Sequence, residues 1–258
     1  MTQFLSRSSR LLGAATLLTA VGAVGSASAA VVSVPYSNDF TAGEDFTESP
    51  ASVWSLDTSA GTYTYTSEFS TGRATLTADG LGGTVDPSDF TATTSFSVSD
   101  SSDNSNADTN GLLLLGEDED PGEYILVDFS SRSLLRIINI GGPGNGSLVN
   151  TSQNTSGDGV TFAENQSFTL SVDGTYDAVG NLSLSASVTD GVNTSTLTAS
   201  DLVLGGNYDG AGFGLRSRFG AGGGEVTAAY DSFSVVPEPA SFALLGLGGF
   251  CLMTRRRG

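Results

Sequence analysis

The stretch Phe168-Thr169-Leu170-Ser171-Val172 alternates apolar and polar side chains, which is the pattern of a half-buried β-strand. Residues 182–188 repeat this alternation as Leu-Ser-Leu-Ser-Ala-Ser-Val. Asp173-Gly174 follows the first run and Asp190-Gly191 follows the second. Glycine in such a pair supplies the positive φ that a tight hairpin turn requires. We therefore expect β-strands that end in hairpin turns at Asp173-Gly174 and Asp190-Gly191.

The period of two continues through residues 30–235, in short segments rich in Thr, Val, Leu, Phe and Tyr. Clusters of Gly, Asp, Asn and Ser separate these segments and indicate turns. We expect no helix between residues 30 and 235. The expected strands are Thr62–Ser67, Arg73–Ala78, Thr91–Ser99, Gly111–Leu115, Tyr124–Ser130, Leu134–Ile140, Gln166–Val172, Leu182–Thr189, Thr194–Ala199, Gly212–Phe219 and Val226–Val235.

Residues 30–235 number roughly 205 and contain no Pro/Ser-rich linker, which fits a single β-sandwich domain. Leu112–Leu115 and Ile137–Ile140 are almost continuously apolar, as expected for strands covered on both faces. We therefore predict an all-β, jelly-roll-like antiparallel sandwich, flanked by an N-terminal signal helix and a short C-terminal hydrophobic helix. A pair of smaller immunoglobulin-like domains is the alternative.

Residues 1–29 have the order of a secretory signal peptide. Arg7 and Arg10 form a basic start, residues 11–21 are mainly apolar, and Ala27-Ser28-Ala29 supplies a small-residue cleavage signal. We expect export, with cleavage after Ala29.

Residues 236–258 show a second membrane-related pattern. Pro237-Glu238-Pro239 precedes a run of apolar and small residues, and Arg255, Arg256 and Arg257 follow it. The 14 residues 240–253 would cover about 21 Å as a helix, less than a hydrocarbon core of about 30 Å. The run would engage a membrane without making a good permanent span. Arginines stay on the cytoplasmic side, so the body is expected outside the inner membrane.

The segment Val236-Pro237-Glu238-Pro239-Ala240, with its Leu/Gly-rich run and arginine cluster, resembles the PEP-CTERM sorting signal. The resemblance implies a bacterium that makes exopolysaccharide and an exosortase, a membrane transpeptidase, that processes the tag. It also implies a transient tether to the inner membrane, followed by release to the cell surface or extracellular matrix.

The body resembles the laminin-G-like or concanavalin-like jelly roll. The resemblance rests on Ser37-Asn38-Asp39-Phe40, on residues 168–174, and on Phe213–Ser217 followed by Tyr230–Val235. It implies that the first and last strands pair side by side.

The body is strongly acidic. Residues 30–235 hold five arginines and no lysine or histidine against 27 Asp and Glu, a net charge of −22. Such a body repels phosphate backbones and anionic lipids, which argues against nucleic-acid binding. Divalent cations, or polymers bridged by them, are the natural electrostatic partners, while a solvated acidic surface accounts for the charge equally well. Cys251 is the single cysteine and lies in the tag, so the body has no disulfides.

A nucleophile–base triad is excluded because the body has no His, Lys or Cys. A carboxylate pair could still hydrolyse a glycosidic bond, and Glu117 and Glu119 would share a face on extended backbone. Gly116 and Pro121-Gly122 frame residues 117–120 as a loop tip. We therefore expect a solvated acidic loop and a protein that is not an enzyme.

Two weaker binding sites remain as hypotheses. Asp100, Asp103 and Asp108, with Glu117 and Glu119, offer the oxygen ligands that calcium prefers, although simple turns explain Asx-rich loops as well.

Trp54, Tyr63 and Tyr65 could stack on a sugar ring from one face of a strand, or could equally form sandwich core. The leading hypothesis is a non-catalytic surface or matrix protein associated with exopolysaccharide. A calcium-assisted lectin-like module is the alternative, and a carboxylate-pair glycoside hydrolase acting on the same polysaccharide is the third candidate.

We predict that the mature protein from its native host lacks both ends of the sequence. Mass spectrometry is expected to find Ala30 at the N-terminus and no peptide containing Arg255–Gly258. Recovery of intact Arg255–Gly258 from the surface form would contradict processing of the tag.

Overall fold

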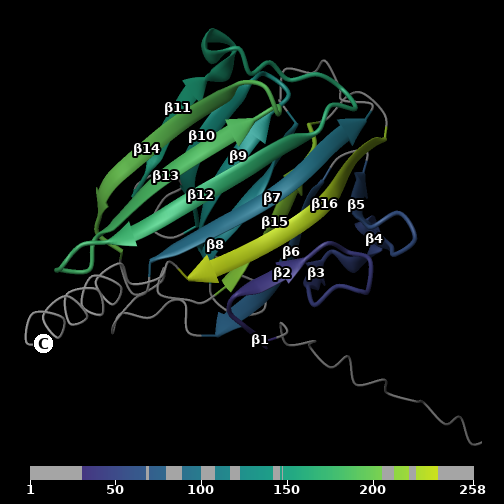
Figure 1. Ribbon diagram of the computed structural model, residues 1–258, viewed down its shortest axis with the longest axis horizontal. Helices are drawn as coiled ribbons and strands as arrows, with labels where there is room; N and C mark the ends of the chain where they lie inside the picture. The colour runs from purple at the N-terminus through teal and green to yellow at the C-terminus, as the bar shows by residue number, and fades with distance from the viewer. Residues whose placement is uncertain are drawn as a thin grey trace, which may run out of the picture.

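The computed structural model describes residues 31–67, 70–79, 89–99, 108–116, 123–141, 146, 148–204, 212–220 and 225–237. Within these ranges the chain is almost entirely β-structure, with two short 3₁₀ turns at Ala51–Val53 and Thr155–Asp158. The strands form two eight-stranded sheets that stack face to face (Figure 1). An all-β sandwich with jelly-roll-like layers is therefore confirmed.

Sheet A has the order β1-β6-β15-β8-β9-β10-β11, and β3 also pairs with β6. All its pairs are antiparallel except β1 with β6. Its strands are β1 (Val31–Ser33), β3 (Thr47–Ser49), β6 (Thr71–Asp79), β8 (Thr109–Gly116), β9 (Tyr124–Ser130), β10 (Leu134–Ile140), β11 (Asn150–Asn154) and β15 (Gly212–Arg218).

Sheet B has the order β14-β13-β12-β7-β16-β5-β4, and β2 also pairs with β16. It is antiparallel throughout its described pairs. Its strands are β2 (Tyr36–Asn38), β4 (Trp54–Asp57), β5 (Thr62–Ser67), β7 (Phe90–Ser99), β12 (Phe168–Tyr176), β13 (Leu182–Thr189), β14 (Thr194–Leu202) and β16 (Val226–Pro237).

The main core lies between the sheets and is built by the inward side of each strand. Alternate residues of β7 are buried, from Phe90 to Val98, and their side chains meet those of sheet A. Polar groups also cross this core: Ser217 of β15 donates to Asn110 of β8 at 2.8 Å, and its hydroxyl lies 2.7 Å from that of Tyr230 of β16. The two sheets are therefore joined by a buried hydrogen-bonded chain as well as by apolar packing.

The last strand lies at the centre of sheet B. β16 pairs with β7 on one side and with both β5 and β2 on the other. Tyr36 of β2 stands opposite Val235, so the pairing of early and late strands implied by the jelly-roll resemblance is observed. β16 continues to Pro237, which stands opposite Phe90. The fold thus extends two residues into the segment expected to be the tag.

The turn expected at Asp173-Gly174 is wrong. Both residues lie inside β12, opposite Ser185 and Leu184 of β13. The chain reverses instead at residues 177–181, where the Asp177 carboxylate accepts the backbone N–H groups of Val179 and Asn181 at 2.9 Å each. Gly174 serves packing, because a Cβ there would lie 2.4 Å from the ring of Phe90. The turn at Asp190-Gly191 is confirmed, with Gly191 at φ +88°.

Two further expectations need adjustment. Leu112–Leu115 is buried on both faces, as expected, but Ile138 and Ile140 are only half-buried while Ile137 is fully buried. The expected strand list also misses β1, β2, β3, β4 and β11, each of three to five residues.

We predict that Gly174→Ala destabilises the protein by about 1–3 kcal/mol, because an added methyl group must displace the buried ring of Phe90. Urea unfolding of the variant measures this cost. Gly157→Ala is the matched control, since nothing lies within 4 Å of its added Cβ. Equal stability of the two variants would contradict the packing role of Gly174.

Candidate functional site: the outer face of sheet A

The strands of sheet A have a second side that points away from sheet B, here called the outer face. Along β9, Ile125, Val127 and Phe129 belong to the main core, whereas Tyr124 and Leu126 form a separate apolar cluster with Leu113 of β8. Successive side chains of a strand point to opposite faces. Tyr124, Leu126 and Asp128 therefore lie on the outer face.

The outer face holds most of the positive charge of the body. Of the five arginines in residues 30–235, Arg73, Arg136, Arg216 and Arg218 alternate with core residues on β6, β10 and β15. Arg132 lies in the turn between β9 and β10. Strands distant in the sequence thus bring four arginines to one side of one sheet.

Three of these arginines stand in a single line across the strands. Residues directly opposite one another on neighbouring strands share a face of the sheet. Successive opposite partners, read from β3 to β11, are Ser49, Arg73, Arg216, Gly111, Asp128, Arg136 and Ser152. We call this line the arginine row.

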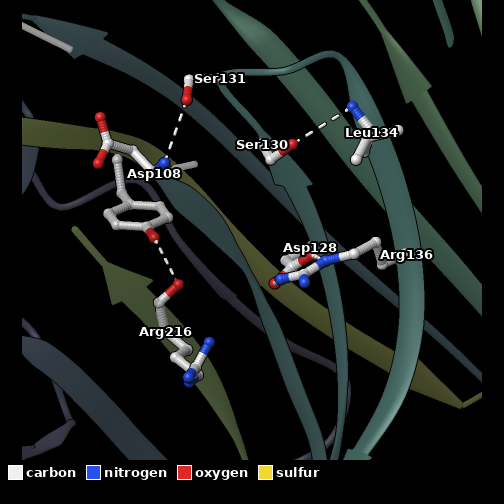
Figure 2. Close-up of polar contacts among 8 residues, drawn as sticks. Asp108, Asp128, Ser130, Ser131, Leu134, Arg136 and Arg216 are labelled. Carbon is white, nitrogen blue, oxygen red and sulfur yellow. Dashed lines mark hydrogen bonds and ion pairs between the residues drawn. The ribbon is translucent and has the colours of Figure 1, made fainter. Parts of the chain in front are cut away.

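One end of the arginine row is an ion pair. Arg136 donates from Nε to Asp128 Oδ1 at 2.7 Å and from Nη2 to Oδ2 at 2.5 Å, the two-pronged geometry of a strong pair (Figure 2). Asp128 is fully buried, whereas the Arg136 side chain is 30 % exposed. Burial lowers the pKa of Arg136, but the hydrogen bonds and charge of Asp128 outweigh burial and raise it overall. Asp128 therefore engages the Nε and Nη2 groups of Arg136.

Arg216, at the middle of the row, has a different environment. The residue is 6 % exposed, and its Nε is buried with no hydrogen-bond partner among the described residues. The contact drawn for Arg216 in Figure 2 is made by its backbone carbonyl, which accepts the Tyr230 hydroxyl at 3.2 Å. A buried guanidinium without a counter-ion is costly, so Arg216 stands out chemically on this face.

Two positions of this face near Arg216, Gly111 and Gly214, carry no side chain. An added Cβ at Gly111 would lie 2.1 Å from the Val127 carbonyl oxygen, and one at Gly214 would lie 2.1 Å from that of Ala74. Backbone contacts this short exclude any larger residue. The Arg73 guanidinium reaches across β15 and β8 to lie 6.0 Å from the ring centroid of Tyr124.

The three aromatic residues proposed to bind glycans lie elsewhere. Trp54, Tyr63 and Tyr65 are 7 %, 0 % and 0 % exposed and belong to the main core. Trp54 stacks on Tyr63 with ring centroids 4.9 Å apart, and Tyr63 donates to Glu48 at 2.7 Å. Their ring faces are covered by other rings and cannot stack on a sugar, so the core interpretation holds for them.

The calcium hypothesis rests largely on residues outside the described ranges. Asp100, Asp103, Glu117 and Glu119 all lie there, as does Glu238 of the sorting motif. Asp108 is described and buried, and its Oδ1 accepts the Gly220 N–H at 2.9 Å. No group of three or more potential metal ligands occurs among the described residues. Calcium binding stays a prediction.

A separate hollow of about 520 Å³ lies beside β2 and is lined partly by Asp39, Glu44 and Asp45. The hydroxyl of Tyr36 donates to Asp45 at 3.0 Å, and burial is the main reason that its pKa rises to about 12. Hydrogen bonds of the loop itself use Asp39 and Asn38, so this hollow is a weaker candidate than the arginine row.

Comparison with known families gives one match, to the PEP-CTERM protein-sorting motif, over residues 235–257. The chain ends in a PEP-CTERM sorting tag. The tag marks an exported protein with a C-terminal sorting signal, and it implies processing by an exosortase. Its first three residues, 235–237, are the end of β16. Among the described residues no helix is long and apolar enough to span a membrane, and the apolar run of the tag lies outside them.

No curated protein matches the chain, but solved structures share its fold. Lectin I from Ulex europaeus aligns with a TM-score of 0.52 and 11 % identity, over 78 % of this chain and 96 % of that one. Lectin I-B4 from Griffonia simplicifolia gives 0.50 and 13 %, over 80 % and 100 %. The PL-14 alginate lyase from Aplysia kurodai gives 0.50 and 10 %, over 68 % and 82 %.

The last likeness corrects the expectation that the PEP-CTERM protein is not an enzyme. That expectation rested on the missing His, Lys and Cys and on the loop-tip position of Glu117 and Glu119. The same fold is that of an alginate lyase as well as of lectins, so the fold and composition of this chain do not exclude catalysis.

We predict that the Asp128–Arg136 pair stabilises the face only as a unit. Arg136→Met leaves a buried carboxylate unpaired and is expected to cost about 3 kcal/mol or more in the free energy of unfolding. The double variant Asp128→Leu/Arg136→Met removes both charges and is expected to recover most of that loss. Chemical denaturation of the three proteins measures the difference. A double variant as unstable as the single one would be inconsistent with this reasoning.

Proposed function

We propose that this exported protein binds extracellular polysaccharide through the outer face of sheet A. The observation that carries the proposal is the arginine row, together with the gathering of four of the five body arginines on that face. Lectin-like neighbours support it only to the extent that their fold is the same. The PEP-CTERM tag supports a location where such polymers are found.

The chemistry of the face suits a sugar polymer. Arg73, Arg136 and Arg218 present N–H donors at half-buried or exposed positions, and hydroxyls and ring oxygens of sugars accept such bonds. Leu113, Tyr124 and Leu126 form a buried apolar cluster on the same face, each at most 2 % exposed. From Arg73 to Arg136 the row crosses four strand spacings, or about 19 Å. Several sugar units of one chain would therefore contact the row.

The test is binding to a panel of soluble neutral and acidic polysaccharides by affinity electrophoresis, with and without EDTA. Ser152→Glu adds a negative charge at an exposed position at the end of the row and is expected to weaken binding about five- to tenfold. Ser200→Glu makes the same change at an exposed position on the edge strand β14 of sheet B and should leave binding unchanged.

Lack of binding to every polysaccharide, or equal loss in Ser152→Glu and Ser200→Glu, would reject the proposed face. Loss of binding in EDTA alone would favour the calcium-assisted lectin-like module. Unchanged binding in EDTA would argue against it.

A polysaccharide lyase is the second candidate function, favoured by the position of Arg73 over Tyr124 on the same face. In β-elimination a base removes a proton from the sugar carbon next to a carboxylate. A carbon–carbon double bond then forms as the glycosidic C–O bond breaks. A guanidinium can neutralise the carboxylate, and a tyrosine in its phenolate form can take the proton from carbon and return it to the leaving glycosidic oxygen.

Incubation with alginate or polygalacturonate, followed by ultraviolet absorbance of the unsaturated product, tests this activity. We expect Tyr124→Phe to abolish any activity while retaining the fold. Absence of product with the unmodified protein would reject a lyase acting on these two polymers, and the hydrolase candidate is tested in the same samples by release of reducing sugar.

A further inference from the structure

We propose that the outer face of sheet A selects carboxylated polysaccharides, and that Arg216 is the residue that binds a sugar carboxylate. This inference rests on the proposed function and narrows its ligand from polysaccharides in general to those that contain uronic acids. It is based on a difference within the arginine row: Arg136 has Asp128 as its counter-ion, whereas no counter-ion is seen for Arg216 among the described residues.

Arg216 is the cation of the row for which the described residues provide no counter-ion. It is 94 % buried, its Nε has no hydrogen-bond partner, and no ion pair is seen for its guanidinium among the described residues. Arg136, in contrast, is satisfied by Asp128. Since an arginine keeps its charge when buried, a ligand anion would complete this site.

The neighbouring position in the row favours such an anion. Gly111 stands directly between Arg216 and Asp128, and the backbone of β9 approaches it too closely for any Cβ. Gly111 therefore offers no side chain that could neutralise Arg216, and the β9 backbone fills the space directly above it. A ligand carboxylate would have to pair with the guanidinium of Arg216 itself, while Asp128 is engaged by Arg136.

A carboxylated polysaccharide is favoured over a more highly charged one, such as a sulfated polysaccharide, for two reasons. The planar guanidinium matches the two oxygens of a carboxylate in a two-pronged pair. The body as a whole carries −22, so a polymer with many strong charges is repelled at long range. At 0.15 M ionic strength this repulsion is screened beyond about 8 Å, whereas a partly buried pair is screened much less. Binding should thus hold or improve as salt rises from low to physiological levels.

The test compares polygalacturonate with its methyl ester, which has the same backbone without the negative charges, by isothermal titration calorimetry at physiological ionic strength. We expect the acid to bind at least tenfold more tightly than the ester. Arg216→Gln is expected to weaken binding of the acid about ten- to a hundredfold and to leave binding of the ester nearly unchanged. Arg132→Gln removes the same charge from the turn between β9 and β10 and serves as the matched control.

Because Arg216 is buried, circular dichroism and thermal unfolding must show that Arg216→Gln is folded. Arg218→Gln is the second variant, since Arg218 is exposed on the same face. It is expected to lower affinity for the acid a few-fold without a risk to folding. Unchanged affinity in Arg218→Gln would contradict the inference if Arg216→Gln does not fold.

Equal binding of acid and ester, equal effects of Arg216→Gln and Arg132→Gln, or tighter binding of dextran sulfate than of polygalacturonate would each overturn the inference. If the ester and neutral polysaccharides still bind and Ser152→Glu still weakens them, polysaccharide binding stands and only carboxylate selection fails. If no polysaccharide binds, the proposed function fails as well.

Discussion

The packing of sheet A against sheet B occupies one side of every long strand of sheet A, and the placement of charge depends on this contact. Leu112, Ile125, Val127 and Leu135 seal the inner side, where an unpaired charge would be too costly to bury. Residues of the opposite parity must then lie on the outer face. Arg136 and Asp128, which alternate with these core residues, are held there by the register of the strands. The arginine row is thus a consequence of how the core is filled.

The outer face combines a satisfied pair with an unsatisfied cation. Asp128 and Arg136 neutralise each other and link β9 to β10. Arg216 lies three strand spacings from Arg136, and the part of the chain that the structure describes provides no counter-ion for it. Arg216 is buried beside glycine backbone, and no ion pair is seen for it among the described residues. This feature is the basis for proposing an anionic ligand. The PEP-CTERM tag marks the protein for export. Strand β16 connects the sandwich to the tag, because its last residues are the first residues of the tag.

Much of the fold could be predicted from the sequence because a period of two is a local signal. Thr62–Ser67, Tyr124–Ser130, Leu134–Ile140 and Leu182–Thr189 coincide with observed strands. Short strands such as Thr47–Ser49 escape notice, since three polar residues show no period. Gly174 resembles a turn glycine, but a contact with Phe90, 84 positions earlier, decides its role. Trp54, Tyr63 and Tyr65 had two interpretations that only packing could separate.

The candidate site could not be predicted in the same way. Arg73, Arg136 and Arg216 become neighbours of one row only through pairings between strands far apart in the chain, such as β6 with β15, and no local pattern fixes such pairings. The central claim is that Arg216 meets a sugar carboxylate on this face. Heteronuclear NMR of the arginine side-chain Nε–H groups during titration with oligogalacturonate tests it most directly. We expect the Arg216 Nε–H signal to shift with saturation while that of Arg132 stays in place. Saturable binding that leaves the Arg216 signal unmoved would contradict it.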